Sequence, residues 1–205
     1  MKKFLAFTMA AAMTLSLAAC GGGSSSGSNT SADGSGSAAF KLGGTGPLTG
    51  DASIYGLAAQ RGAQIAVDEI NAEGGAIQFE LKYEDDVNDP EKAVNAYNAL
   101  KEWGMQISLG SVTTQPCIAT SSYNFADSIF ALTPSASSPD VISGKDNVYQ
   151  MCFSDPNQGT ASAQYIAEQK LGEKIFIIWK SDDNYSTGIK DKFMAEAEKL
   201  GLNVV

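Results

Sequence analysis

The sequence predicts an α/β protein built on a doubly wound parallel sheet. Short apolar runs typical of buried strands alternate along the chain with longer segments in which apolar residues recur at helical spacing. Helices of this length between successive strands require right-handed crossovers, which make neighbouring strands parallel. In open sheets of this kind ligands bind outside the carboxyl ends of the strands, so the loops at those ends are the expected place of function.

The expected elements follow from hydrophobic periodicity and from end signals in the sequence. Asp89 is placed to cap a helix that begins at Pro90, and Val67 and Ile70 are expected on the inward face of the helix before it. We expect strands at residues 39–43, 77–84, 107–109, 129–132, 148–153 and 174–179, with one more beginning at residue 203. We expect helices at residues 54–72, 90–103, 117–126, 158–171 and 187–200.

The N-terminus carries an export signal. Two lysines precede an almost wholly apolar stretch, residues 4–19, which is typical of a signal peptide rather than a transmembrane helix. The stretch Leu17-Ala18-Ala19-Cys20 resembles the lipobox of bacterial lipoproteins, in which cleavage precedes a cysteine that receives a diacylglycerol. We therefore expect a signal peptide at residues 1–19 and lipid on Cys20; the alternative is an ordinary signal peptide with a chance cysteine. The Gly- and Ser-rich residues 20–39 predict a flexible tether.

The composition excludes several classes of function. The chain has 14 Lys and Arg against 23 Asp and Glu, a net charge of −9, which disfavours nucleic acid as a partner because phosphates need clustered cations. It has no His, so Ser-His-Asp and Cys-His catalysis and His-ligated metal sites are excluded. We expect no metal ion, no cofactor and no enzymatic activity, and contact with a membrane through the N-terminal lipid only.

Two cysteines remain once Cys20 is assigned to the lipid. Cys117 and Cys152 then form one possible pair. In an oxidising compartment outside the cytoplasm we expect a disulfide between them. The alternative is two buried free thiols.

Small polar residues fill the loops after the expected strands, at residues 44–53, 110–116, 133–139 and 181–186. Short hydroxyl side chains and free backbone N–H groups at a helix N-terminus suit an anionic group such as a carboxylate. No strong base stands near to activate these hydroxyls, so the loops indicate binding without chemistry. The alternative is that the hydroxyls only cap helices and form turns.

An acidic cluster, Asp85, Asp86 and Asp89, follows the second expected strand. Its spacing fits no EF-hand loop, so we expect a solvated loop that ends in the helix cap at Asp89 rather than a calcium site. The glycines of residues 44–50 also depart from the dinucleotide-binding fingerprint, because the last glycine comes one residue late and Pro47 intervenes.

An ordered set of motifs resembles one family. The motifs are GPLTG at residues 46–50 with Tyr55-Gly56, AVDEIN at 66–71, YEDD at 83–86, TQP at 114–116, TPSASSP at 133–139 and QG at 158–159. Over residues 40–205 they resemble the type 1 periplasmic binding proteins that serve branched-chain amino-acid ABC transporters. The resemblance implies two α/β lobes with the ligand held in the cleft between them.

The resemblance also implies a set of ligand contacts, at Tyr55, Ser111, Ser135, Ala136, Ser137 and Tyr185. Ser111 would offer its hydroxyl and backbone N–H to the α-carboxylate of an amino acid. Ser135 would offer its carbonyl to the α-ammonium group, and Ser137 would contact both ends. Tyr55 would line the rim of the first lobe, and Tyr185 would reach in from the second.

The family's later segments are absent, which implies a C-terminally truncated chain. The first ligand-binding lobe would then span residues 40–153, and the crossover with an incomplete second lobe would span residues 154–205. The implied function is that of an extracytoplasmic lipoprotein, anchored to the cell membrane, that captures an amino acid, branched-chain in type, for the permease subunits of an ABC importer. We expect a monomer. The alternative is a ligand-binding sensory module that works with a membrane receptor.

Overall fold

Five parallel strands form one sheet in the part of the chain that the structure, a computed structural model, describes: residues 39–205. They are β1 (Phe40–Gly46), β2 (Phe79–Asp85), β3 (Ile107–Ser111), β4 (Phe130–Thr133) and β5 (Val148–Gln150). Their order across the sheet is β2-β1-β3-β4-β5, and each neighbouring pair is parallel. The prediction of a parallel sheet is confirmed.

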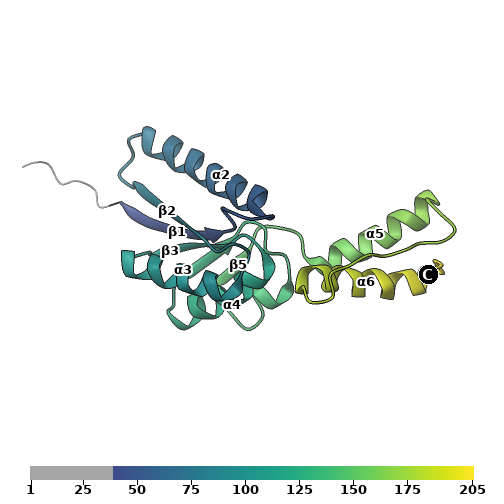
Figure 1. Ribbon diagram of the computed structural model, residues 1–205. Helices are drawn as coiled ribbons and strands as arrows, with labels where there is room; N and C mark the ends of the chain where they lie inside the picture. The colour runs from purple at the N-terminus through teal and green to yellow at the C-terminus, as the bar shows by residue number, and fades with distance from the viewer. Residues whose placement is uncertain (1–38) are drawn as a thin grey trace, which may run out of the picture. The chain divides into compact units, whose positions relative to one another are not determined.

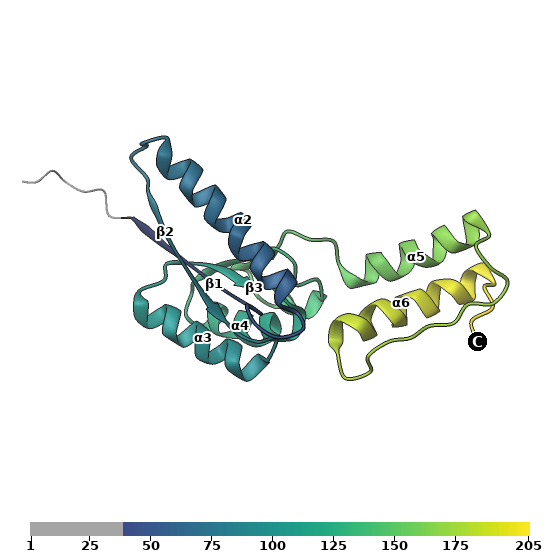
Figure 2. The ribbon, with the colours of Figure 1, turned by 45° about the horizontal axis from the view of Figure 1, so that its top comes forward.

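Helices cover both faces of this sheet (Figure 1). The helix α2 (Ser53–Ala72) lies on one face, and α3 (Pro90–Trp103) and α4 (Thr114–Ala126) lie on the other (Figure 2). This division follows from the strand order: the chain moves one way across the sheet from β1 to β2 and the opposite way from β2 to β3. Right-handed crossovers in opposite directions place their helices on opposite faces, which is the doubly wound arrangement.

Local end signals place α3 as the sequence predicts. The Asp89 side chain accepts a hydrogen bond from Lys92 N at 2.8 Å, Pro90 occupies the first turn, and Gly104 ends the helix in the left-handed conformation. Tyr97 and Leu100 on its inner face are 1% exposed. The prediction that Asp89 caps a helix is therefore confirmed.

The inward face of α2 is only partly as expected. Val67 is buried, but Ile70 is 44% exposed. Its neighbour Asn71 takes the inward position instead, because the Asn71 amide donates to Phe79 O at 2.8 Å and accepts from Phe79 N at 2.9 Å. A polar clamp onto the first residue of β2 thus sets the rotation of the last turn of α2.

Beyond the sheet, α5 (Asp155–Gln169) and α6 (Asn184–Leu200) lie side by side and are called here the helical pair (Figure 2). Ala163, Phe193 and Ala197 form its buried cluster. The helices approach closely at Gly159, where a Cβ atom would lie 2.3 Å from the carbonyl oxygen of Ile189. Only glycine fits at that crossing.

The strand expected at residues 174–179 is not formed as such. The segment is extended, but its pairing consists of a single parallel bridge between Ile175 and Val204. Ile175 and Ile177 pack against the buried cluster, whereas Phe176 and Ile178 are 73% and 87% exposed. The alternation of side chains is that of a strand, but within residues 39–205 no neighbouring strand supplies a ladder.

The N-terminal predictions lie outside the described residues: the signal peptide at 1–19, the lipid on Cys20 and nearly all of the tether at 20–39. The described residues all belong to one compact unit, so the predicted division between residues 153 and 154 stays a prediction. No helix in this part of the chain is long and apolar enough to cross a membrane.

Candidate functional site

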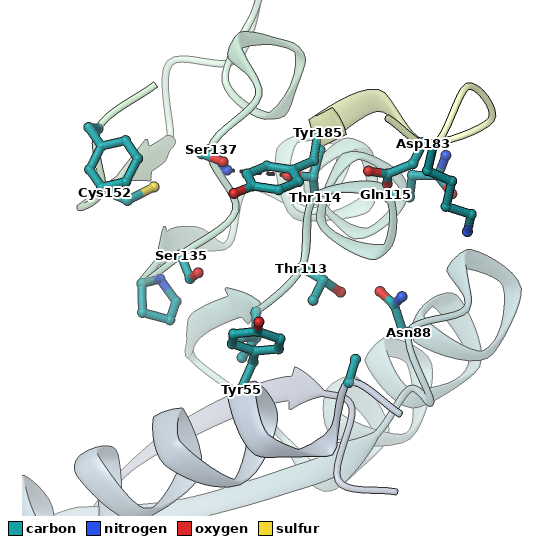
Figure 3. Close-up of a pocket in the computed structure, with 15 residues that line it drawn as sticks. Tyr55, Asn88, Thr113, Thr114, Gln115, Ser135, Ser137, Cys152, Asp183 and Tyr185 are labelled. Carbon is teal, nitrogen blue, oxygen red and sulfur yellow. Dashed lines mark hydrogen bonds between the residues drawn. The ribbon is translucent and has the colours of Figure 1, made fainter. Parts of the chain in front are cut away.

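A cavity of 540 Å³ opens at the carboxyl ends of the strands (Figure 3). Its walls come from the residues that follow each strand of the sheet and from the residues around the start of α6. The volume falls within the range of about 300–1,000 Å³ typical of small-molecule sites. The strand order reverses beside β1, and ligands in doubly wound sheets bind at such a switch point.

The N-terminus of α4 forms one wall of the cavity. Thr113, Thr114 and Gln115 all line it, and Thr113 flanks the helix without making a side-chain cap. The first N–H groups of a helix have no partner inside the helix and carry its positive dipole end. The Thr113 hydroxyl is also buried without a hydrogen-bond partner among the described residues. This wall therefore offers donors to an anionic group.

A second wall comes from the loop after β4. Ser135 and Ser137 line the cavity, and Ser137 N donates to the Thr114 hydroxyl at 3.3 Å, the dashed line in Figure 3. This bond joins the β4 loop to the start of α4. The two hydroxyl-rich loops are thus held together at one end of the cavity.

Two tyrosines face the cavity from different elements. Tyr55 lies in the first turn of α2 and is 64% exposed, and Tyr185 lies in the first turn of α6 and is 42% exposed. Figure 3 shows their rings on opposite sides of the cavity, with the serine loop between them. Four of the six predicted contact residues, Tyr55, Ser135, Ser137 and Tyr185, are therefore brought together.

Ser111 does not line the cavity, which corrects the expectation that its hydroxyl meets the ligand. Its side chain is 0% exposed, and its hydroxyl pairs with the Thr45 hydroxyl at 2.6 Å and with the Thr120 hydroxyl at 2.9 Å. Ser111 stands opposite Thr45 where β3 pairs with β1, so its hydroxyl is enclosed between the sheet and α4. Ser111 thus holds α4 against the sheet through Thr120, and the residues that form this wall of the cavity are Thr113, Thr114 and Gln115.

Ala136 also lies away from the cavity. It is 1% exposed and packs in a buried cluster with Cys117 and Val141. Its carbonyl oxygen accepts from Gln150 Nε2 at 2.6 Å and from the Cys152 thiol at 3.4 Å. Ala136 thus anchors the serine loop from behind.

The expected disulfide between Cys117 and Cys152 is not formed, and both cysteines are free thiols. Cys117 is fully buried, and burial raises its pKa to about 11. The Cys152 thiol is engaged with the Ala136 carbonyl and lines the cavity, and burial raises its pKa as well. The structure therefore matches the alternative of two free thiols, although Cys152 is only partly buried.

The acidic cluster after β2 is divided between surface and core. Asp85 holds the loop after β1, because its carboxylate accepts from Leu48 N at 2.8 Å and from the Thr49 hydroxyl at 2.6 Å. Asp86 is 0% exposed, and burial raises its pKa to about 6. No group of three or more His, Cys, Asp or Glu in residues 39–205 is placed to hold a metal ion.

Several wall residues were not predicted as contacts. Asn88 reaches the cavity from the loop after β2, where it adopts a left-handed backbone conformation with φ of 59°. An Asn in a turn is a weak signal for that conformation, because Asn tolerates it better than most residues. Lys180 and Asp183 also line the cavity, and Asp183 caps α6 by accepting from Ser186 N at 2.9 Å.

The comparisons with known proteins agree with this geometry. The family described as periplasmic binding protein matches residues 39–205. The chain belongs to that family. The description of the family implies a location outside the cytoplasm, and the parallel α/β fold described above is the fold of its members.

Individual relatives are described by their amino-acid ligands. A Leu/Ile/Val-binding protein homolog from Brucella melitensis is 31% identical over 162 residues, which are 78% of this chain and 44% of the relative. A leucine-binding protein from Thermotoga maritima superposes with a TM-score of 0.75 at 25% identity, covering 81% of this chain and 47% of that one. A branched-chain amino-acid transporter substrate-binding protein from Streptococcus pneumoniae, solved with isoleucine, gives a TM-score of 0.74 at 25% identity, with the same coverage. The chain spans less than half the length of these relatives.

Proposed function

We propose that this protein captures an amino acid, branched-chain in type, and delivers it to an ABC importer. The observation that carries the proposal is the cavity at the strand ends, where the uncapped start of α4 meets the serine loop. Membership in the periplasmic binding protein family supports it, as do relatives described as leucine- and isoleucine-binding.

The α-carboxylate of the ligand binds at the start of α4. Its negative charge meets the backbone N–H groups of Thr114 and Gln115 and the hydroxyl of Thr113. The serine loop contacts the ammonium end, through the Ser135 carbonyl and the Ser137 hydroxyl. The rings of Tyr55 and Tyr185 close over the ligand from the two sides of the cavity.

The setting of this activity is also part of the proposal. Lipid on Cys20 anchors the mature protein to the outer side of the cell membrane, and a Gly- and Ser-rich tether joins the anchor to the folded part. Permease subunits are its protein partners, and the protein acts as a monomer without cofactor or catalysis. The excess of acidic over basic residues, which gives the whole sequence a net charge of −9, keeps the folded part from binding along an anionic lipid surface.

The test is titration calorimetry of the protein with L-leucine, L-isoleucine and L-valine. We expect saturable binding that Thr113→Val weakens about 10- to 100-fold, since a hydrogen bond to a charged group contributes about 1.5–3 kcal/mol. Ser122→Ala, on the exposed face of the same helix, is the matched control and should leave the affinity unchanged. An absence of binding by all three amino acids would contradict the proposal.

A further inference from the structure

Asp86 is a buried carboxyl group, and one of its oxygens has no hydrogen-bond partner among residues 39–205. The side chain is 0% exposed; its Oδ1 accepts from Asn88 N at 2.9 Å, whereas its Oδ2 has no donor. Ionising such a group is costly, and burial raises the pKa of Asp86 to about 6. Asp86 therefore changes between an acid, which can donate a hydrogen bond, and a carboxylate, which only accepts.

The charged groups that act on Asp86 are acidic. Asp85 at the end of β2 and Asp89 at the cap of α3 both act on it with negative charge, and Tyr83 in β2 lies near enough to be affected by it. On β1 the Thr45 hydroxyl lies close enough to lower its pKa. Thr45 is thus the side chain with which the Asp86 carboxyl group can exchange a hydrogen bond.

Three hydroxyl groups lead from this point to the start of α4. The Thr45 hydroxyl lies 2.6 Å from the Ser111 hydroxyl, which lies 2.9 Å from the Thr120 hydroxyl. Thr120 donates to Pro116 O at 3.2 Å. None of the three hydroxyl side chains is more than 3% exposed. These three groups, called here the hydroxyl chain, therefore join the Asp86 carboxyl group to the first turn of α4 out of contact with bulk water.

The direction of the hydroxyl chain follows from its donors. The Pro116 carbonyl only accepts, so the Thr120 hydroxyl uses its single proton there and accepts from Ser111. Ser111 then accepts from Thr45, which leaves the Thr45 oxygen open to a donor. Protonated Asp86 is that donor. Ionised Asp86 instead draws the Thr45 proton toward itself, and the resulting reversal of the chain takes the Thr120 proton away from Pro116.

The backbone around Asp86 is held independently of this proton. Val87 and Asn88 both have left-handed backbone conformations, with φ of 51° and 59°, which a β-branched residue such as Val rarely adopts. Asp85 Oδ1 accepts from Val87 N at 2.9 Å, and Asp86 Oδ1 accepts from Asn88 N. Asn88 lines the cavity (Figure 3). The loop and this part of the wall thus stay in place when Oδ2 gains or loses its proton.

We propose that Asp86 is a positioning residue, which sets the direction of the hydroxyl chain and thereby the strength with which the start of α4 binds the carboxylate of a ligand. This inference rests on the proposed function and adds a residue that acts on the site without touching the ligand. When Asp86 is protonated, the O–H dipoles of the chain all direct their positive ends toward α4, where the ligand carboxylate binds. The bond from Thr120 to Pro116 also holds the first turn of the helix in place. Ionisation of Asp86 removes both contributions.

Affinity for an amino acid should therefore depend on pH. Asp86 is protonated well below pH 6 and ionised well above it, whereas L-leucine keeps its carboxylate and ammonium charges on both sides of this value. The affinity should be highest on the acid side and fall about 2- to 10-fold as the pH rises through about 6. By linkage, binding near that pH should raise the pKa of Asp86 and take up a proton.

The test is titration calorimetry with L-leucine from about pH 5 to about pH 8. Asp86→Asn keeps an acceptor for Asn88 N and offers Thr45 a permanent donor, so it should bind with the acid-side affinity at every pH. Asp51→Asn, an exposed aspartate in the loop after β1, is the control and should keep the pH dependence of the wild type. A purely structural role for Asp86 would change the affinity by the same factor at every pH, and that result would overturn the proposal.

A second variant tests the hydroxyl chain itself. Ser111→Ala removes the middle hydroxyl, so the affinity should lose its pH dependence while the free energy of unfolding keeps the pH dependence that Asp86 gives it. Full pH dependence of binding in Ser111→Ala would overturn the proposal. Should Ser111→Ala or Asp86→Asn fold poorly, Thr45→Val, which keeps the shape of the side chain, cuts the chain at its other end. Calorimetry of the wild type in buffers of different ionisation enthalpy needs no variant, and binding without proton uptake near pH 6 would contradict the proposal.

The same titrations separate this proposal from the proposed function. L-leucine bound by the wild type with equal affinity at every pH would overturn the role of Asp86 and leave the capture of an amino acid standing. An absence of binding by L-leucine, L-isoleucine and L-valine at every pH would contradict both.

Discussion

The sheet segment, from β1 to β5, and the helical pair bury apolar side chains and pair their backbone groups in different ways. Every strand of the sheet is paired with a neighbour, and Tyr97 and Leu100 are almost wholly buried beneath it. The helical pair buries Phe193 between two helices that need no lateral partner, yet the extended segment beside it leaves Ile178 87% exposed. Helix hydrogen bonds are local, whereas a strand depends on a neighbour elsewhere in the chain.

The two regions also differ in how they hold a buried carboxyl group. Asp86 in the sheet segment accepts a hydrogen bond from Asn88 N at 2.9 Å and lies beside Thr45. Asp155 in the helical pair accepts none. The first is enclosed by its own loop, and the second faces the back of a cavity wall. Burial alone therefore does not determine how a carboxyl group is held by its surroundings.

The largest expected effect tests the difference in core packing. Leu100→Ala should lower the free energy of unfolding by about 2–5 kcal/mol, because the side chain is 1% exposed and its removal leaves a cavity. Ile178→Ala, which removes apolar atoms from an 87% exposed side chain, should change it by about 0.5 kcal/mol at most. Urea denaturation measures both. Equal losses would show that the extended segment is packed in solution.

A second prediction concerns pH and the buried carboxyl group of the sheet. The pKa of Asp86 is about 6 in the folded chain and 3.8 for an ordinary Asp, so the folded protein keeps the proton longer. The contribution of Asp86 to the free energy of unfolding should thus be fully present below about pH 4. It should be lost, by about 2–3 kcal/mol, as the pH rises through 6. Asp86→Asn should flatten that part of the stability profile. The exposed Asp51→Asn should retain the slope, and a slope unchanged in Asp86→Asn would contradict the assignment.

A third prediction asks whether the helical pair unfolds by itself. Gly159→Ala places a methyl group against the backbone of α6, which should cost about 1–3 kcal/mol in local stability. Hydrogen exchange should then speed up across α5 and α6 and stay unchanged in β1 and β3. Gly62→Ala, where a Cβ meets nothing within 4 Å, is the control. Faster exchange throughout the sheet would show that the two regions form one cooperative unit.

The smallest expected effect compares two helix caps of the same kind. Asp89→Ala and Asp183→Ala each remove a capping side chain that accepts a hydrogen bond from an N–H group in the first turn of a helix. Each should lower the stability by about 1 kcal/mol. Loss of the cap of α3 should lower the midpoint of global unfolding, whereas loss of the cap of α6 should appear first as faster hydrogen exchange in that helix. Asn in either position should restore most of the loss; a rescue that fails would assign the effect to charge rather than capping.

The parts of the fold that could be predicted from the sequence were those fixed by local chemistry. Asp89 and Pro90 set the start of α3, and helices between apolar runs required a parallel sheet. The segment at residues 174–179 could not be assigned correctly, because alternation reports which faces are apolar and not whether a neighbouring strand is present.

The candidate site also has features that could be predicted from the sequence and features that could not. A strand-end position predicts nearness to the cavity, and Tyr55, Ser135, Ser137 and Tyr185 do lie there. It does not predict the direction of a side chain at the last residue of a strand, which depends on register with the neighbours. Ser111 stands opposite Thr45, and that pairing directs its hydroxyl into the core.

The place of β1 has a mechanical consequence. This first described strand runs inside the sheet, hydrogen-bonded to β2 on one side and β3 on the other. A pull on the chain before Phe40 would load both ladders in shear at once, instead of peeling an edge strand one bond at a time. The seven residues of β1 span about 23 Å at about 3.3 Å per residue, so the point of traction and the cavity lie at opposite ends of the strand. The hydrogen bonds of β1 to β2 and β3 would therefore resist tension at the N-terminus before that tension could distort the cavity.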